Sequence, residues 1–340
     1  MQSIKVAING CGRIGRAFLR VSKAHPEIEV VAVNDLATIE SISYLLKYDT
    51  VYKKAPFTVL HTDKSLIIDG KEIAYLSEKD ATKLPWKDFN IDVVVESTGL
   101  FTSYEKAKAH LEAGAKRVVI TAPAKGESGD VKGETILMGI NEDKLSTCQI
   151  SSNASCTTNA GSPLIAILDE AIGIEKAILN TVHGYTASQA IVDGPSKKDL
   201  REGRAAAQNI VPSSTGAAIA TTKAFTKLAG KFDGISIRVP VIVGSIVDIT
   251  FIAKRDTTAE EVNSILKRAA MESRWSNIFA VTEEPLVSSD IIGEAHASIA
   301  DLEMTRVVDG NLVKVLGWYD NEMGYTHTLV DHVIKAGQLS

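Results

Sequence analysis

The stretch Ile4-Lys5-Val6-Ala7-Ile8-Asn9-Gly10-Cys11-Gly12-Arg13-Ile14-Gly15-Arg16 decides the fold of the N-terminal half of this chain. An apolar, β-branched run leads into a Gly-x-Gly-x-x-Gly turn, and a helical pattern of apolar residues follows it through Val21. The glycines permit a tight turn, close approach of the backbone to a pyrophosphate, and close packing of helix on strand. Glycine-rich turns are common, so the flanking strand and helix are what favour a dinucleotide-binding βαβ unit over a structural turn.

A carboxylate follows the next predicted strand. Residues 28–33 form that strand, which ends in Asn34 and Asp35. Asp35 lies 20 residues after Gly15, a spacing typical of an acidic side chain that hydrogen-bonds the ribose of NAD. The same charge repels the additional phosphate of NADP. The spacing therefore predicts NAD as the cofactor.

Further strands in the first half predict an open parallel sheet. Strand-like runs occur at residues 91–97, 117–120, 137–140 and 149–151, with a helical pattern at 104–113. Nearly continuous apolar strands that alternate with helices are typical of a parallel sheet. Cofactors bind at the carboxyl ends of such strands, where Thr98 and Thr121 fall. Residues 52–75 differ, because short alternating runs flank Asp69-Gly70, and they predict an inserted β-hairpin.

The stretch Ser152-Asn153-Ala154-Ser155-Cys156-Thr157-Thr158-Asn159 lies between a predicted strand and a predicted helix. The dipole and free N–H groups of a helix N-terminus stabilise a thiolate, which predicts a lowered pKa and a nucleophilic Cys156. The hydroxyls of Ser155 and Thr157 suit a developing oxyanion. The alternative is a small buried hydrophobe, which polar neighbours disfavour. Pro163 either begins the regular helix or kinks one that begins at Cys156, and the dipole argument is stronger in the second case.

A histidine follows the next predicted strand, residues 177–182. His183 lies 27 residues after Cys156, and a β-α-β return can bring two such strand ends together. The pair could then form a thiolate and an imidazolium. The alternative is a hydrogen-bonded histidine at a strand end.

Two further features suit anions. Arg238 is the single charge in the apolar run 235–243, and a buried guanidinium needs either a substrate phosphate or a structural carboxylate. Thr215-Gly216 precede a predicted helix and form either an anion-binding nest or an ordinary N-cap.

The second half of the chain predicts a mixed or antiparallel sheet. Strand-like runs occur at 235–239, 246–253 and 312–318, with helices at 259–271 and 329–336. Residues 187–209 form a long polar loop, which indicates a functional segment or an interface, although its mixed charges also fit a solvated face. The fold class is therefore α/β, with an N-terminal Rossmann-type parallel-sheet domain and an α+β catalytic domain.

Composition excludes several classes of protein. The 340 residues are enough for two domains, and 45% are hydrophobic and 23% charged, as in ordinary globular proteins. A net charge of −5 argues against nucleic-acid binding. The longest apolar stretch, 239–253, is too short and too polar to span a membrane. Three cysteines, no CxxC or HExxH pattern and no signal-peptide core predict a cytoplasmic protein without a metal site.

Taken together, the motifs resemble those of phosphorylating glyceraldehyde-3-phosphate dehydrogenases over essentially the whole chain. The motifs in common, in chain order, are NGCGRIGR, VAVND, LLKYDT, VVESTG, AKRVVITAPAK, SNASCTTN, TVHGYTASQ, DGPS, NIVPSSTGAA, RVPV and WYDNEMGY. The resemblance implies NAD-dependent oxidative phosphorylation of D-glyceraldehyde 3-phosphate to 1,3-bisphosphoglycerate, in glycolysis and gluconeogenesis. Inorganic phosphate is the implied second substrate, and a cysteine thiohemiacetal and thioester are the implied intermediates.

The resemblance also implies residue roles. Cys156 is the expected nucleophile and His183 the expected base. The expected NAD contacts are Gly10, Gly12, Arg13, Ile14, Asp35, Thr98, Thr121 and Asn321. The expected contacts to the substrate's own phosphate are Thr186 and Arg238, and those to inorganic phosphate are Ser155, Thr157, Thr215 and Gly216.

We expect residues 1–154 to bind NAD, residues 155–321 to form the catalytic domain, and residues 322–340 to return as a helix to the first domain. The family resemblance implies a homotetramer in which the loop after Ala187 lines a neighbouring cofactor site. One alternative is an erythrose-4-phosphate dehydrogenase, which shares the cysteine motif but resembles this chain less at Thr186 and Thr215-Gly216. The other is a non-enzymatic NAD-binding redox sensor that uses Cys156 only as an oxidation target.

Overall fold

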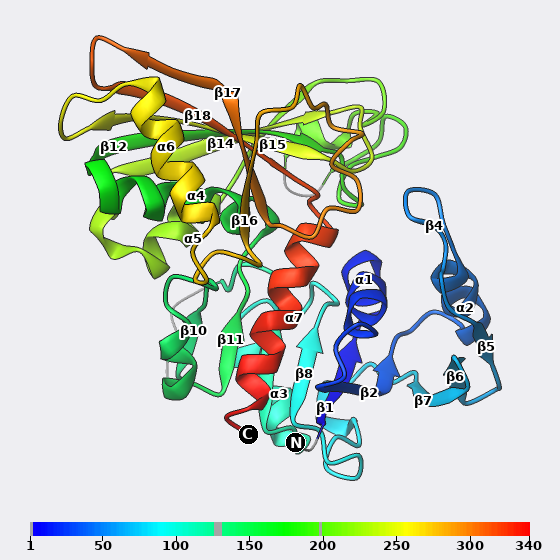
Figure 1. Cartoon of the computed structure of the whole chain (residues 1–340). Helices are drawn as coiled ribbons and strands as arrows, with labels where there is room; N and C mark the ends of the chain where they lie inside the picture. The colour runs from blue at the N-terminus through cyan, green and yellow to red at the C-terminus, as the bar shows by residue number, and fades with distance from the viewer. Residues whose placement is uncertain (1–2, 126–130, 197–198) are drawn as a thin grey trace. The chain divides into compact units, whose positions relative to one another are not determined.

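The computed structural model describes residues 3–125, 131–196 and 199–340 (Figure 1). The chain divides into two compact units. Unit 1 comprises residues 1–154 and 326–340, and unit 2 comprises residues 155–325. Each unit is built around one large sheet.

Unit 1 contains a nine-stranded sheet with the order β10-β11-β9-β8-β1-β2-β7-β6-β5. Its strands are β1 (Ile4–Asn9), β2 (Ile28–Asn34), β5 (Val59–His61), β6 (Ser65–Ile68), β7 (Lys71–Leu76), β8 (Val93–Glu96), β9 (Arg117–Ile120), β10 (Gly133–Thr135) and β11 (Ile150–Ser152). The strands from β10 to β7 pair in parallel, whereas β6 and β5 form an antiparallel edge. The apolar run that predicts β8 is buried along the whole strand. The predicted parallel sheet is confirmed.

Helices cover both faces of this sheet. They are α1 (Arg13–Ser22), α2 (Ile39–Lys47), α3 (Tyr104–Glu112) and the unit 1 part of α7 (Met323–Gly337), with 3-10 turns η1 (Ala81–Lys83) and η2 (Glu142–Thr147) and a small ribbon of β3 (Tyr48–Asp49) and β4 (Lys53–Lys54). Right-handed crossovers place α1, between β1 and β2, and α3, between β8 and β9, on opposite faces. Trp86 and Ile91 pack in the core on the α3 side. Unit 1 is therefore a mainly parallel sheet with helices on both faces.

The hairpin predicted within residues 52–75 is confirmed and one predicted strand is wrong. Asp69 and Gly70 join β6 to β7 with φ values of 48° and 78°, as a tight hairpin turn requires. Residues 137–140 form a buried turn, in which Gly139 has a φ of 78°, and the strand lies earlier, in β10. A short apolar run indicates burial but does not distinguish a strand from a packed turn.

Unit 2 contains a seven-stranded mixed sheet with the order β13-β14-β12-β15-β18-β17-β16. Its strands are β12 (Ile174–Gly184), β13 (Val211–Ser214), β14 (Phe232–Val239), β15 (Ser245–Ala253), β16 (Phe279–Thr282), β17 (Ser298–Val308) and β18 (Leu312–Tyr319). Its helices are α4 (Cys156–Ile172), α5 (Ala217–Ala224) and α6 (Ala259–Ala270), with 3-10 turns η3 (Leu200–Gly203) and η4 (Thr226–Leu228). Parallel pairs β12–β14 and β16–β17 combine with antiparallel neighbours, which confirms the predicted mixed sheet.

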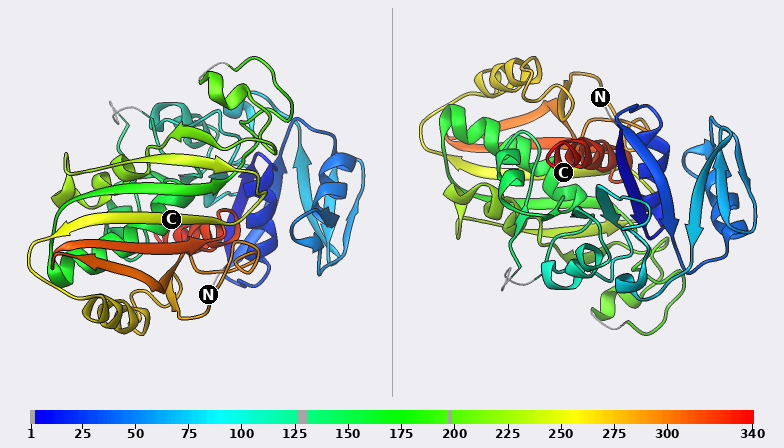
Figure 2. Two further views of the ribbon diagram at one scale, coloured as in Figure 1. Left: turned by 90° about the horizontal axis from the view of Figure 1, so that it is seen from above. Right: turned by 90° about the horizontal axis from the view of Figure 1, so that it is seen from below.

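One face of the unit 2 sheet packs on α4. Along β15, buried and half-buried residues alternate, and the Cα of Gly161 in α4 lies close to the buried side chains of Leu179 and Ile249. Strict alternation is typical of a sheet with one packed and one open face. In the view from above, the strands lie toward the viewer with helices behind them (Figure 2).

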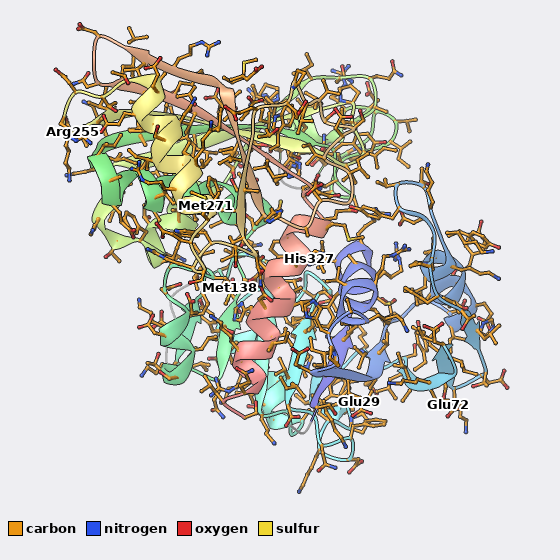
Figure 3. All side chains as sticks on the ribbon, in the orientation of Figure 1. Glu29, Glu72, Met138, Arg255, Met271 and His327 are labelled. Atoms are coloured by element: carbon orange, nitrogen blue, oxygen red, sulfur yellow. The ribbon has the colours of Figure 1, made fainter. Side chains whose placement is uncertain are left out.

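Charged side chains lie on the surfaces of both units. Glu72 on β7 and Arg255 after β15 project outward from their ribbons and are exposed (Figure 3). Across the residues that the structure describes, every helix is too short or too polar to cross a membrane.

Candidate active site

The glycine turn of unit 1 leaves space for an anion. Gly10 has a φ of 94°, and a Cβ added there would lie 2.6 Å from the backbone nitrogen of Thr98. Gly12 is the N-cap of α1, and a Cβ added there would meet nothing within 4 Å. The open N-terminus of α1 therefore fits a pyrophosphate, since its backbone N–H groups and dipole favour negative charge.

The other candidate NAD contacts of unit 1 lie at the same edge of the sheet. Asp35 follows β2, and its carboxylate accepts the N–H of Cys11 at 2.6 Å and that of Ala37 at 2.9 Å. Arg13 begins α1 and pairs with Asp49 at 2.7 Å, and Ile14 is half-buried beside it. The acidic side chain thus lies against the glycine turn, where a dinucleotide ribose fits.

Two threonines lie at the same edge of the sheet as the glycine turn and Asp35. Thr98 follows β8 and Thr121 follows β9, as predicted. Both contact Glu96, because the N–H of Thr98 donates to its carboxylate at 2.9 Å and the N–H of Thr121 donates to its backbone oxygen at 3.0 Å. We call Gly10, Gly12, Asp35, Thr98 and Thr121 the cofactor cradle. Glu96 was not predicted from the sequence, although an acid directly after the apolar run 93–95 was the available signal.

Cys156 lies at the N-terminus of a long helix in unit 2. Ser155 caps α4, and its Oγ accepts the N–H of Thr158 at 3.1 Å. Ala154, which precedes this cap, has a φ of 55°, a left-handed conformation that is unfavourable for a residue with a Cβ. Pro163 lies inside the helix. Of the two sequence alternatives, a helix that begins at Cys156 is therefore the correct one.

The structure places the predicted base beside this cysteine. His183 lies near the end of β12, and its Nε2 is 3.3 Å from the Sγ of Cys156. The packing of α4 against β12 brings together two residues that are 27 positions apart. The alternative, a histidine bonded only within a strand end, does not describe this geometry.

Tyr319 supports both sides of the pair and was missed by sequence analysis. Its hydroxyl lies 2.9 Å from the Oγ1 of Thr157 in α4 and 2.8 Å from the Oγ1 of Thr181 in β12. Its ring meets the imidazole of His183 edge-on, with 5.9 Å between centroids. The motif WYDNEMGY contains this tyrosine, but no local pattern reveals which distant hydroxyls it contacts.

Burial favours the uncharged forms of the pair. Desolvation raises the pKa of the Cys156 thiol, while the Arg238 guanidinium and the N–H of Thr157 oppose this shift. Desolvation, followed by the charge of Arg238, lowers the pKa of His183 to about 3. The direction for Cys156 is opposite to the one predicted from the helix N-terminus, because desolvation outweighs the opposing charge of Arg238 and the hydrogen bonds from Thr157. Both shifts favour a thiol and a neutral imidazole in the free site over the ionised pair that was predicted.

Arg238 lies directly beside His183. The two residues face each other across the parallel pair β12–β14, and the Arg238 Nη1 is 2.5 Å from the His183 Nδ1 and 3.3 Å from the Gly184 oxygen. Among the described residues no carboxylate lies within ion-pair distance of this guanidinium. Of the two partners considered for Arg238, a structural carboxylate is therefore absent among the described residues, and a substrate phosphate remains.

The remaining predicted residues of unit 2 lie on three other segments. Thr186 follows β12 and contacts the Ser188 hydroxyl at 3.0 Å. Thr215 accepts the N–H of Ala217 at 3.2 Å, and Gly216 caps α5. Asn321 accepts the N–H of Gly244 at 3.1 Å and the hydroxyl of Ser245 at 3.2 Å.

Only part of the predicted set is joined by direct contacts. Cys156, His183 and Arg238 form one continuous cluster. Within the portion of the chain that the structure describes, no hydrogen bond joins Thr186, Gly216 or Asn321 to that cluster. The same portion holds no group of three or more His, Cys, Asp or Glu side chains arranged to bind a metal.

Comparisons with known proteins identify the family to which each unit is similar. A model of the glyceraldehyde 3-phosphate dehydrogenase NAD binding domain matches residues 4–104, and one of the C-terminal domain matches residues 155–321. A glyceraldehyde-3-phosphate dehydrogenase of Thermotoga maritima is 51% identical over 96% of this chain and 97% of its own length. The corresponding protein of Geobacillus stearothermophilus is 47% identical, with 97% of each chain covered. Glyceraldehyde-3-phosphate dehydrogenase 3 of Saccharomyces cerevisiae is 44% identical over 98% of this chain and all of its own. The chain therefore belongs to the glyceraldehyde-3-phosphate dehydrogenase family.

Proposed function

We propose that this protein catalyses the NAD-dependent oxidation and phosphorylation of D-glyceraldehyde 3-phosphate to 1,3-bisphosphoglycerate, in glycolysis and gluconeogenesis. The observation that carries the proposal is the 3.3 Å contact between the Cys156 sulfur and the His183 imidazole. A nucleophile and a base at this separation can transfer one proton directly between them.

The first step is addition of Cys156 to the aldehyde. The Sγ bonds to the carbonyl carbon, and the thiol proton moves to Nε2 of His183. This nitrogen is free to accept a proton in the tautomer whose Nδ1 donates to the Gly184 oxygen at 2.6 Å. The resulting imidazolium then hydrogen-bonds the new oxyanion and keeps its proton as the carbonyl re-forms. An aldehyde has no leaving group, so this thiohemiacetal is what makes loss of hydride from its carbon feasible.

NAD supplies the acceptor for that hydride when it is bound. The cofactor cradle would hold its pyrophosphate and adenosine end, with Arg13 and Ile14 at the pyrophosphate and Asp35 at the ribose. Asn321 would hold the nicotinamide carboxamide. The chain's own product at this point is a thioester between Cys156 and the acyl group.

Phosphate chemistry completes the reaction. Thr186 and Arg238 bind the phosphate that the substrate carries, and the substrate gives Arg238 an anionic partner. Ser155, Thr157, Thr215 and Gly216 hold inorganic phosphate, whose oxygen attacks the thioester carbon. The C–S bond breaks, the acyl phosphate leaves, and Cys156 recovers its proton from His183.

Steady-state assays test this assignment against its sister reaction. NADH formation is measured with glyceraldehyde 3-phosphate and with erythrose 4-phosphate, each with and without inorganic phosphate. The proposal predicts a higher kcat/KM for glyceraldehyde 3-phosphate and a requirement for phosphate. A clear preference for erythrose 4-phosphate, or turnover that does not depend on phosphate, contradicts it.

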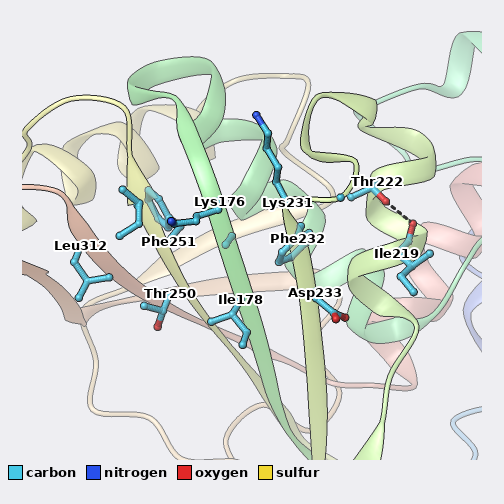
Figure 4. Close-up of a pocket in the computed structure, with 13 residues that line it drawn as sticks. Lys176, Ile178, Ile219, Thr222, Lys231, Phe232, Asp233, Thr250, Phe251 and Leu312 are labelled. Atoms are coloured by element: carbon cyan, nitrogen blue, oxygen red, sulfur yellow. Dashed lines mark hydrogen bonds between the residues drawn. The ribbon is translucent and has the colours of Figure 1, made fainter.

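We also propose a homotetramer, supported by the open face of the unit 2 sheet. Ile178 on β12 and Ile235 on β14 are 58% and 52% exposed there. A hollow of about 700 Å³ is lined by residues of these two strands and of β15, β18 and α5, among them Ile178, Phe232 and Leu312 (Figure 4). Apolar side chains grouped on one face favour association with a second copy.

The cysteine content, with no disulfide among Cys11, Cys148 and Cys156, fits a cytoplasmic location.

A further inference from the structure

A buried glutamate lies beneath the cofactor cradle and has no part in the proposed chemistry. Glu96 ends β8 and is only 2% exposed. A buried carboxylate is unfavourable unless hydrogen-bond donors surround its oxygens. The donors around Glu96 therefore identify the residues that fix its carboxylate and the residues that the carboxylate positions.

The donors on one side can be assigned from their chemistry. The Trp86 Nε1 can only donate, and it lies 3.1 Å from the Nδ1 of His110, which must accept. In a neutral His110 the proton is then on Nε2, which donates to Glu96 Oε2 at 2.9 Å. The Asn9 Nδ2 donates to the same oxygen at 2.6 Å, and the Asn9 Oδ1 accepts from Asn34 at 2.7 Å.

The other oxygen of Glu96 faces the cradle. The backbone N–H of Thr98 donates to Oε1 at 2.9 Å, and the Thr98 hydroxyl donates to the same atom. The Thr98 hydroxyl oxygen in turn accepts the N–H of Leu100 at 3.0 Å. Both oxygens of Glu96 thus meet donors only, which is the arrangement that an ionised carboxylate satisfies and a neutral carboxyl does not.

Glu96 reaches three parts of the cradle through these bonds. It fixes Thr98, whose backbone forms the wall that leaves no room for a side chain at Gly10. Its backbone oxygen accepts both the N–H and the hydroxyl of Thr121, at 3.0 and 3.1 Å. Through Asn9 it reaches Asn34, which directly precedes Asp35.

We propose that Glu96 is a positioning residue for NAD, and that its buried carboxylate sets the geometry of Thr98 and the glycine turn. This inference rests on the proposed role of the cradle in holding NAD. Glu96 touches neither the reacting sulfur nor the base, so its loss weakens NAD binding and leaves the chemical step unchanged.

The test is Glu96→Gln in the full-length protein. The side chain keeps its shape, but an NH2 group replaces one oxygen and faces two donors. We expect the Kd for NAD, measured by calorimetric titration of the nucleotide-free protein, to rise about tenfold or more. The KM for NAD rises in parallel, and kcat at saturating NAD stays within about twofold of wild type.

A matched control separates positioning from general loss of stability. Asn141 is also buried in unit 1, where it accepts the N–H of Leu137 and donates to the Thr135 oxygen, away from the cradle. Asn141→Asp is expected to lower thermal stability and leave the Kd for NAD unchanged. An equal rise in Kd in both variants, or an unchanged Kd in Glu96→Gln, overturns the proposal.

A second variant covers the case in which Glu96→Gln does not fold. Trp86→Phe keeps the aromatic packing and removes the N–H that fixes the His110 tautomer. We expect a several-fold rise in the Kd for NAD, with kcat retained, and an unchanged Kd overturns the proposal. Wild-type protein that fails to bind NAD or to turn over contradicts the proposed function instead, so the two failures are distinguishable.

Discussion

At the scale of single residues, the site pairs the proposed nucleophile Cys156 with the proposed base His183, and burial favours the uncharged form of each. Desolvation raises the pKa of Cys156 and lowers that of His183, so both groups favour neutrality before substrate arrives. In the proposed mechanism the 3.3 Å contact lets the thiol proton leave as the carbon–sulfur bond forms. Arg238 influences both groups, since its charge favours a thiolate and disfavours an imidazolium.

His183→Asn tests this account through the reactivity of Cys156. Without the imidazole, only solvent can remove the proton from a thiol whose pKa burial raises. We expect alkylation of Cys156 by iodoacetamide to be at least about tenfold slower than in wild type at pH 7 and to accelerate as the pH increases through 9. Peptide mass spectrometry confirms that the label is on Cys156 rather than on buried Cys11 or Cys148. Equal rates for variant and wild type at pH 7 contradict a role for His183 in deprotonation.

At the scale of elements, the terminal helix α7 is joined to strand β11 by a buried histidine. The His332 Nδ1 donates to the Asn153 oxygen at 3.0 Å, so its Nε2 accepts the Ser151 hydroxyl at 2.8 Å. Burial lowers the pKa of His332 to about 3. The unfolded chain takes up this proton below about pH 6.5, whereas the folded chain does not until about pH 3. Stability is therefore lost as the pH falls through that window.

His332→Asn is expected to flatten this dependence. The variant is less stable at pH 7, because two buried hydrogen bonds are lost. Its unfolding free energy falls less steeply with decreasing pH between 6 and 5, by about 1.2 kcal/mol per pH unit. Urea unfolding at one protein concentration measures both effects, with His61→Asn at an exposed strand residue as the control. A variant with the same pH slope as wild type is the contradicting result.

The elements also show which parts of the fold and the site can be predicted from sequence patterns. The strand, glycine turn and Asp35 were predictable because each depends on neighbours within about 25 residues, and so was the hairpin at Asp69-Gly70. The turn at residues 137–140 was not, because burial alone does not specify backbone conformation. Cys156 and His183 were foreseen from their strand and helix ends. The direction of the Cys156 pKa shift and the contacts of Tyr319 and Glu96 depend on packing between distant segments, which local spacing does not encode.

At the scale of the whole molecule, the sheet of unit 2 leaves apolar side chains uncovered on one face. Ile178 and Ile235 lie on its neighbouring strands β12 and β14. An ion pair between Asp248 and Lys314 joins the next two strands of the same sheet, β15 and β18. An apolar face of this kind is typical of a subunit interface.

Ile178→Asp is expected to disrupt the proposed tetramer. A charge on the open sheet face has no partner in a closed interface, so light scattering after size-exclusion chromatography should report dimers or monomers. Met271→Asp is the matched control, because Met271 is 79% exposed at the end of α6, away from that sheet face. A tetramer that persists in Ile178→Asp, or one that Met271→Asp disrupts equally, excludes this face as the interface.

The central claim is that Cys156 carries the acyl group, and a rapid-mixing experiment without inorganic phosphate tests it most directly. We predict a burst of about one NADH per subunit, followed by slow turnover, with the phosphoglyceroyl group found on Cys156 by mass spectrometry. Cys156→Ser should give neither burst nor adduct while it still binds NAD. Absence of the burst in wild type, or an acyl group on any other residue, would contradict the account.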